Sequence, residues 1–362
     1  MSIRIVITVL FGWLLTSASA QTKKTLQQAD SLLLANYPKN EPGVAVAMIS
    51  GGHIVFSKGY GLASLETRQP IDPKTVFNIA SLTKEFTATA IRKLAAEGKL
   101  RLEDTIGRYI SGLAPAIGSQ VTIKAMLSHG SGMTDHYGFV DTTGIKHATD
   151  ADVLAAVKKT DSLYFSPGTA FRYSNTAYCL LALVVEKVTG QSFAGYMQQA
   201  LLLPAGMKHS FVWQPGSQLN PAATGYDLSE NKTWVPSGPQ ENRFFSTEGD
   251  GGLYTNTEDY AQWFEHTIRR QPIAIQQPIT AKPHMGYGFG WFIDERDKPV
   301  SIYHSGSNGG FRSYVFAQPD AGFMLVLFSN RADKDIEQTA FGLLKLVLSA
   351  KKDLVPIQYL TN

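Results

Sequence analysis

Two residues that could act together on a substrate lie three positions apart in the stretch N-I-A-S-L-T-K-E-F. They are Ser81 and Lys84. Residues i and i+3 share one face of a helix, so the lysine amine can reach the serine hydroxyl. A serine hydroxyl becomes a good nucleophile when a neighbouring group takes its proton, and the free N–H groups of a helix start can stabilise an oxyanion. The pair therefore indicates nucleophilic catalysis. The alternative is that Ser81 caps the helix and Lys84 is solvated.

Two further segments place reactive side chains at the ends of predicted elements. F-R-Y-S-N-T-A-Y carries Tyr173 and Asn175 directly before a strongly apolar helix. Y-H-S-G-S-N-G-G-F ends a predicted strand with His304, Ser305 and Gly306. Taken alone, Asn175 is typical of a helix N-cap, whereas glycine in a strand lets another backbone approach closely.

In this order, Ser-x-x-Lys, Tyr-x-Asn and a Lys- or His-x-Gly triplet resemble the motifs of the serine β-lactamase and penicillin-binding protein superfamily. The Tyr-x-Asn form is similar to that of class C β-lactamases, related D-alanyl-D-alanine carboxypeptidases, and esterases and peptidases of the same fold. The segments T-I-K-A-M-L-S-H-G-S-G-M (122–133) and E-G-D-G-G-L-Y-T-N-T-E-D (248–259) agree with this resemblance. It covers nearly the whole chain after residue 20.

The resemblance implies a role for each matched residue. Ser81 would attack the substrate carbonyl and become acylated, with Lys84 beside it as base or electrostatic partner. Tyr173 would pass the proton to the leaving group. Whether Lys84 or Tyr173 takes the first proton stays open, because coupled groups titrate as a unit. Asn175 would orient Lys84 and donate to the substrate amide, and His304 would lie close to Tyr173.

The same resemblance implies the groups that hold the substrate. The oxyanion hole would be the backbone N–H groups of Ser81 and Ser307, while Ser305 and Gly306 would belong to the substrate-binding site. His304 replaces the lysine of most β-lactamases, and a histidine is mostly neutral at pH 7. We therefore expect amide or ester substrates such as D-amino-acid peptides, small esters or β-lactams, with inefficient β-lactam hydrolysis. The alternative is a penicillin-binding or sensor-type protein that is acylated with little turnover.

Other catalytic classes lack their motifs in this chain. It has no G-x-S-x-G elbow of an α/β-hydrolase and no H-E-x-x-H metal motif. Asp135-His136 follows His129, but the further closely spaced histidines of a metallo-β-lactamase are missing, so we interpret His129 as a hydrogen-bonded loop residue. The only cysteine, Cys179, lies in an apolar run, which favours a buried hydrophobe over a nucleophile. We expect no metal and no cofactor.

The elements that must position these residues are strands near both ends of the chain, with helices between them. A first helix over about 25–37 precedes strands over 43–50 and 53–61 that are joined by a Gly-Gly turn. A helix that starts after Ser81 ends near residue 96, and residues 214–249 are predicted as a long loop. Further strands are predicted over 286–293, 301–304, 312–319 and 322–329, followed by an amphipathic helix over about 334–350.

Hairpins at the two ends can bury their apolar faces in one shared antiparallel sheet that the terminal helices cover. The sequence therefore predicts an α+β fold, an α/β/α sandwich, which agrees with the β-lactamase/transpeptidase-like fold that the resemblance implies. We expect one hydrolase domain over 21–362. Its sheet lobe would span about 25–80 and 285–350, and its mostly helical lobe about 81–284.

The first 20 residues predict export. Arg4, an apolar run and Ala18-x-Ala20 form the pattern of a secretory signal peptide cleaved after Ala20. The run is shorter than the roughly 20 apolar residues of a spanning helix, so we expect a periplasmic or secreted protein without a stable membrane anchor. The formal net charge is +3, with acids and bases interspersed. We therefore expect a small-molecule or peptide substrate, for example one derived from peptidoglycan, and no nucleic-acid partner.

Overall fold

The computed structural model describes residues 24–349 apart from 139, 141, 142, 144–146, 217–221, 240, 241, 280, 281, 283 and 297. The predicted signal peptide over 1–20 therefore lies outside the described residues. Among the helices that are described, none combines the length and the apolar character that crossing a membrane requires.

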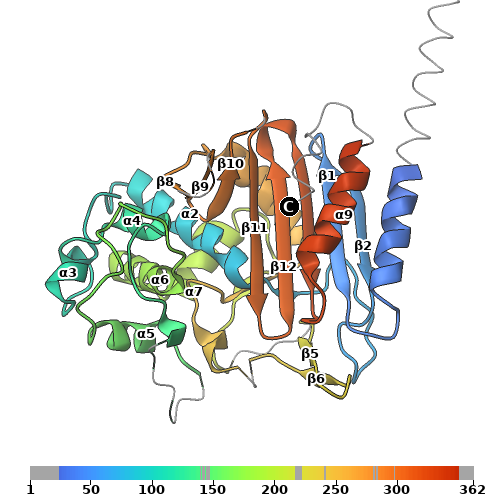
Figure 1. Cartoon of the computed structure of the whole chain (residues 1–362), viewed down its shortest axis with the longest axis horizontal. Coiled ribbons are helices and arrows are strands. Elements are labelled where there is room, and N and C mark those ends of the chain that lie inside the picture. Colours follow the sequence, from blue (N-terminus) through green and yellow to red (C-terminus); the bar gives the residue numbers. More distant parts are fainter. Residues whose placement is uncertain are drawn as a thin grey trace, which may run out of the picture.

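An eight-stranded antiparallel sheet, built from both ends of the chain, forms the centre of the fold, as predicted (Figure 1). Its strands are β1 (Val44–Ser50), β2 (His53–Tyr60), β8 (Gln277–Pro278), β9 (Met285–Gly288), β10 (Trp291–Asp294), β11 (Ser301–Asn308), β12 (Phe311–Gln318) and β13 (Phe323–Ser329). They lie in the order β2-β1-β13-β12-β11-β10-β9-β8, so β1 lies between its hairpin partner β2 and the late strand β13.

The two faces of this sheet bury separate apolar cores, because successive side chains of a strand point to opposite faces. In β1, Val46 belongs to the core made with the helix over 24–36 and with α9 (Ile336–Ser349). Its neighbour Ala47 belongs to the larger core, which includes the helices of the other face. Figure 1 shows the helix over 24–36 and α9 on the same side of the sheet. The result is the α/β/α layering that the sequence predicts.

A mostly helical region lies beside the sheet (Figure 1). Its α-helices are α2 (Thr83–Ala96), α3 (Pro115–Gly118), α4 (Ile123–Leu127), α5 (Asp150–Val157), α6 (Asn175–Thr189), α7 (Phe193–Met197) and α8 (Thr257–His266). Shorter turns of this region are η1 (Ala80–Leu82), η2 (Ile106–Arg108), η3 (His136–Gly138), η4 (Gln198–Leu202), η5 (Arg243–Ser246) and η6 (Ile268–Arg270), whereas η7 (Pro319–Ala321) joins β12 to β13 within the sheet. The first helix of this region, α2, starts directly after Ser81, so the predicted nucleophile lies where the two parts of the fold meet.

Short strands also occur where the sequence indicates helix or loop. β3 (Phe77–Asn78), β7 (Leu253–Thr255) and β4 (Phe211–Val212) form a small second sheet, in the order β3-β7-β4. β5 (Tyr226–Leu228) and β6 (Trp234–Pro236) form a hairpin within the segment predicted as a long loop. Two- and three-residue strands are too short for an alternating pattern to reveal them.

The predicted strand over 286–293 is in fact the hairpin of β9 and β10. Phe289 and Gly290 form its turn with φ angles of +50° and +89°. A side chain at Gly290 would collide with the backbone of Glu85, so this position requires glycine for space as well as for its backbone angle. The apolar run conceals the turn because one of its two residues is a phenylalanine, which rarely adopts a positive φ.

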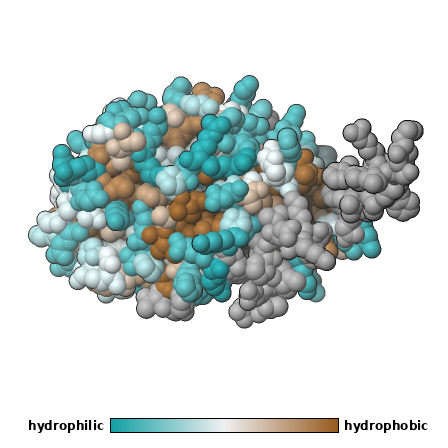
Figure 2. Space-filling model, turned by 90° about the horizontal axis from the view of Figure 1, so that it is seen from above, coloured by the Kyte–Doolittle hydropathy of each residue, from teal (hydrophilic) through white to brown (hydrophobic). Residues whose placement is uncertain are grey.

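On the face shown in Figure 2, apolar residues form separate patches among hydrophilic ones. Exposed large apolar side chains such as Leu34, Ile54 and Leu203 come from distant parts of the chain. Apolar residues scattered singly over a surface are normal for a globular protein and indicate no binding face.

Candidate active site

Ser81 lies in the tight turn η1 between β3 and α2. The residue before it, Ala80, has a φ of +49°, which is unfavourable for a residue with a side chain. Asn78 holds this turn, because its Oδ1 accepts from the Ala80 N–H at 3.0 Å and its Nδ2 donates to the Gly251 carbonyl at 3.0 Å. Ser81 itself is half-buried. A strained turn that presents a serine is a recurring feature of functional sites.

Lys84 lies one turn further along, fully buried in the first turn of α2. Its Nζ lies 3.0 Å from the Ser81 Oγ and 2.8 Å from the backbone carbonyl oxygen of Asp250. The ring of Tyr173 lies on a third side, with its centroid 5.0 Å from the Nζ. The amine is therefore held between the hydroxyl, a carbonyl and an aromatic face, and the Ser81–Lys84 contact that the spacing predicts is present.

Tyr173 precedes α6 and points its hydroxyl at the same region. Its ring packs against His129, with centroids 4.1 Å apart, and stacks nearly parallel to Phe292 at 6.4 Å. The Oη is buried and has no hydrogen-bond partner in the described part of the chain. Because an unpaired buried hydroxyl costs free energy, this one is available to a ligand or a water molecule.

Asn175 has a different partner from the one that the resemblance implies. Its backbone N–H and its Nδ2 both donate to Oδ2 of Asp135, each at 2.9 Å. The bonds of the Lys84 Nζ go to Ser81 and Asp250 instead. The bond to Asp135 uses one N–H of the Asn175 side-chain amide, so only the second N–H of its Nδ2 remains to donate to a substrate.

His304 lies on β11 and is almost fully buried. Its Nδ1 is 2.6 Å from the Ser305 carbonyl oxygen, which can only accept, so Nδ1 carries the proton. Its Nε2 then accepts from the Tyr287 hydroxyl at 3.0 Å. Burial, together with the nearby charge of Lys84, lowers the pKa of His304 to about 3. The imidazole is therefore neutral at physiological pH, as the sequence predicts.

The end of β11 carries a free edge beside Ser81. Its pairing with β10 stops at Tyr303, whereas its pairing with β12 continues to Asn308. Gly306 lets this edge approach η1, because a Cβ there would lie 2.5 Å from the carbonyl oxygen of Ile79. The segment 304–308 can thus offer backbone hydrogen bonds on the side that faces away from β12.

A cavity of about 580 Å³ joins these groups. Ser81, Tyr173 and His304 line it together with the stretch 305–307 of β11, so all the predicted site residues except Lys84 and Asn175 reach its wall. The wall also includes Phe292, Arg312 and residues 332–337. Lys84 lies directly behind Ser81, and Asn175 is held further away by Asp135.

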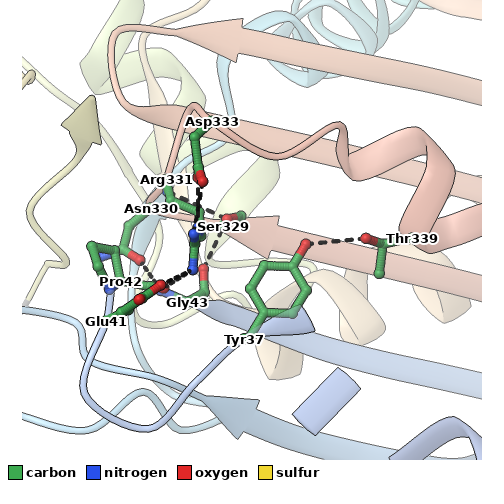
Figure 3. Close-up of polar contacts among 9 residues, drawn as sticks. All are labelled: Tyr37, Glu41, Pro42, Gly43, Ser329, Asn330, Arg331, Asp333 and Thr339. Atoms are coloured by element: carbon green, nitrogen blue, oxygen red, sulfur yellow. Dashed lines mark hydrogen bonds and ion pairs between the residues drawn. The ribbon is translucent and has the colours of Figure 1, made fainter. Parts of the chain in front are cut away.

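The far wall of the cavity is fixed by a buried arginine. Arg331 is only 3% exposed, and its Nε and Nη2 donate to the two carboxylate oxygens of Asp333 at 2.7 and 2.8 Å. Its Nη1 donates to Glu41 at 3.0 Å and to the Pro42 carbonyl at 3.1 Å (Figure 3). The loop over 331–335 is thereby tied to the start of β1, and this holds the wall in place.

Several residues of this site carry no local signal in the sequence. Asp250 contacts Lys84 through its backbone carbonyl, so its side-chain type gives no sign of this contact. In the sequence, only the glycines around Asp250 indicate a turn there. Asp135, Tyr287 and Phe292 hold Asn175, His304 and Tyr173 from segments distant in the chain. Their roles depend on the tertiary packing of the two parts of the fold.

The arrangement can support covalent catalysis. A serine hydroxyl within hydrogen-bond distance of a buried amine meets the geometric requirement for an activated nucleophile. The uncharged His304 and Tyr173 both line the cavity, which is large enough for a small organic substrate.

Comparisons with known proteins agree with this geometry. Protein flp of Staphylococcus aureus (strain MW2) is 30% identical over 323 residues, an alignment that covers 85% of this chain and 64% of that protein. The chain thus spans less than two thirds of the length of the S. aureus relatives. Penicillin-binding protein 4* of Bacillus subtilis (strain 168) is 28% identical over 340 residues, which are 88% of this chain and 75% of that protein.

A solved structure shares the fold along nearly the whole chain. The octameric penicillin-binding protein homologue from Pyrococcus abyssi matches with a TM-score of 0.75 and 25% identity, over 95% of this chain and 80% of its own. The family model described as Beta-lactamase matches residues 32–348. This chain is therefore a member of the Beta-lactamase family.

Proposed function

We propose that this protein is an exported serine hydrolase that works through an acyl-enzyme on Ser81. The observation that carries the proposal is the 3.0 Å contact between the Ser81 Oγ and the buried Nζ of Lys84, at the wall of the cavity. The Ser81 oxygen would attack an ester or amide carbonyl as its proton passes to the Lys84–Tyr173 pair. The backbone N–H groups of Ser81 and Ser307 would stabilise the oxyanion.

Collapse of this intermediate would break the bond to the leaving group and leave the acyl group on Ser81. Tyr173 is the proposed donor of the proton to the leaving amine or alcohol, because its side chain lines the cavity and its hydroxyl has no partner among the described residues. A water molecule would then attack the acyl-enzyme and give a proton to the same pair. The pair would return a proton to the Ser81 oxygen as its bond to the acyl group breaks and the acid is released. His304 would stay neutral throughout.

Two features support peptide-like or ester substrates. The free edge of β11 over 304–308 suits an extended substrate whose backbone pairs with the strand. The neutral His304 cannot supply the permanent charge that a lysine would offer to a carboxylate beside the scissile bond. Small esters, and D-amino-acid peptides without a free carboxylate beside the scissile bond, therefore fit this site better than β-lactams as substrates that are turned over.

The test combines a penicillin with a chromogenic ester. Intact mass is followed over time with the penicillin, and hydrolysis is followed with the ester. Ser81→Ala should abolish both the adduct and the hydrolysis, while Ser31→Ala, at an exposed position, should change neither. Unchanged ester hydrolysis in a folded Ser81→Ala protein would overturn the proposal.

The fate of the adduct separates the related functions. A Ser81-dependent adduct that persists would indicate a penicillin-binding or sensor-type protein with little turnover. One that forms and clears would indicate β-lactamase activity. Ester hydrolysis without an adduct would indicate an esterase or peptidase whose pocket excludes β-lactams.

The proposed export rests on the first 20 residues. Cleavage after Ala20 would give a periplasmic or secreted protein with Gln21 at its N-terminus. N-terminal sequencing of the protein recovered outside the cytoplasm tests this, and an intact N-terminus beginning at Met1 would contradict it.

A further inference from the structure

Three potential metal ligands from distant segments meet in the interior, behind Lys84. They are His136 in η3, Cys179 in α6 and Asp250 in the turn before β7. One donor atom of each lies within 4.8 Å of the other two. All three side chains are buried, and Asp250 has the largest exposed fraction at 3%. None of them lines the cavity at Ser81, so the cluster is separate from that cavity.

The cluster contains polar atoms that the protein leaves unpaired. Both ring nitrogens of His136 and the Oδ1 of Asp250 have no hydrogen-bond partner in the described part of the chain. The Asp250 carboxylate also forms no ion pair with any described residue. A buried polar group without a partner costs about 1–3 kcal/mol, and a buried charge costs more. Unpaired polar atoms on two of the three side chains of one buried cluster indicate a missing occupant.

The chemistry of the donors identifies the occupant. Thiolate sulfur, imidazole nitrogen and carboxylate oxygen together suit Zn²⁺ and related borderline cations, whereas Mg²⁺ and Ca²⁺ prefer oxygen ligands. We propose that His136, Cys179 and Asp250 form a buried site for a divalent cation of the Zn²⁺ class. Binding would replace the Cys179 S–H bond with a metal–sulfur bond and release one proton. The thiolate and the carboxylate would then balance the two charges of the ion.

Neighbouring groups support such a site. Asp150 lies beside the Cys179 thiol. Asp150 is in turn fixed by the N–H groups of Glu248 and Gly249, at 3.1 and 3.2 Å. In tetrahedral zinc sites, ligand atoms lie roughly 3.3–3.8 Å apart, given bonds of about 2.0–2.3 Å, so the three donors would draw together by about 1 Å.

This inference departs from the expectation of no metal that the sequence gives. That expectation considers histidines close together in the chain, whereas these ligands are numbered 136, 179 and 250. Of His129, Asp135 and His136, which lie close together in the chain, only His136 belongs to the cluster. The Nδ1 of His129 accepts from the Ser174 N–H, and the Asp135 carboxylate holds Asn175.

The experiment loads the ion during folding, because the ligands are buried. The full chain is unfolded in denaturant with a chelator and a reductant, and then refolded with one equivalent of Zn²⁺ or Co²⁺. Bound metal is counted by elemental mass spectrometry after gel filtration. The Co²⁺ form is also examined for a thiolate-to-metal charge-transfer band. We expect one ion per chain and a band that depends on Cys179.

Cys179→Ala and Asp250→Asn should each lose the stoichiometric ion, and Cys179→Ala should also lose the band. His209→Ala is the matched control, because this exposed histidine pairs with Asp259 on the surface, and it should keep both signals. Circular dichroism checks that each variant refolds. If Cys179→Ala fails to refold, Asp250→Asn alone tests the loss of the ion. Refolded wild-type protein without bound metal, or folded ligand variants that keep a full equivalent, would overturn the proposal. These readouts do not depend on hydrolase activity.

Discussion

The Nζ of Lys84 lies between the Ser81 hydroxyl, at 3.0 Å, and the backbone carbonyl of Asp250, at 2.8 Å. A carbonyl oxygen can only accept a hydrogen bond, so one N–H of Lys84 points at Asp250 in either protonation state. When the amine is neutral, this bond leaves its lone pair free to accept the Ser81 proton. The Asp250 turn therefore orients the base as well as burying it.

Replacing Lys84 by methionine should remove the base while keeping most of the side-chain volume. We expect the rate of Ser81 acylation to fall by about 10²–10⁴-fold, the usual contribution of a general base. The fold should persist, because an apolar chain of similar size fills the buried space. Pre-steady-state kinetics with an activated ester measure the rate. Lys93→Met, at an exposed position of the same helix, should react like the wild type. A Lys84→Met protein acylated within tenfold of the wild type would exclude Lys84 as the base.

Tyr173→Phe should lower the turnover rate without lowering the free energy of unfolding. The Tyr173 Oη is buried without a partner, so its removal costs no hydrogen bond and should leave the free energy of unfolding unchanged or raise it by about 1 kcal/mol. Turnover should nevertheless fall by about 10²–10⁴-fold if this hydroxyl transfers the proton. Denaturant unfolding and steady-state hydrolysis give the two values. Loss of stability together with full activity would show that the hydroxyl is structural.

His304 should make the protein less stable in acid. Its pKa is about 3 in the folded protein, against an ordinary value of about 6.5 in the unfolded chain. Between these values the unfolded chain binds a proton that the folded protein does not. The stabilisation is therefore complete above about pH 6.5 and is lost as the pH falls towards 3.

The variant His304→Gln isolates this contribution. Between about pH 6 and pH 4, the free energy of unfolding of the wild type should fall by about 1.4 kcal/mol per pH unit more than that of the variant. The lowered pKa of His136 acts in both proteins and cancels in the difference. Burial, the main cause of the lowered pKa of His129, is likewise common to both. Urea unfolding across this range gives the two slopes. Equal slopes would mean that His304 carries a charge in the folded protein.

The sequence predicts those parts of the site that depend on local geometry. Ser81 and Lys84 meet because i and i+3 share a helix face, and the strands at the two ends join because each needs a partner for its apolar face. Contacts between distant segments are not predictable in this way. The carbonyl of Asp250 reaches Lys84, and the carboxylate of Asp135 takes the amide of Asn175, only because tertiary packing brings these segments together.

Arg331→Met should destabilise the protein and loosen the far wall of the cavity. Arg331 is 3% exposed and neutralises Asp333 and Glu41, while its guanidinium lies 4.6 Å from the ring centre of Trp234 (Figure 3 shows the polar contacts). Removing one partner of a fully buried ion pair typically costs 3–5 kcal/mol. Here the side chains of Asp333 and Glu41 are 18% and 42% exposed, so water compensates part of their charge and the cost is about 1–3 kcal/mol. We expect a loss of about this size in urea unfolding.

Two matched variants show whether burial causes the effect. Arg331→Lys should lose less than Arg331→Met, because it keeps the charge but not the forked geometry. Arg269→Met breaks a more exposed pair with Glu265 and should change stability by about 1 kcal/mol or less. Because residues 332–337 line the cavity, KM for an ester should rise in Arg331→Met more than kcat falls. If Arg331→Met unfolds within 1 kcal/mol of the wild type, the buried arginine does not hold this wall.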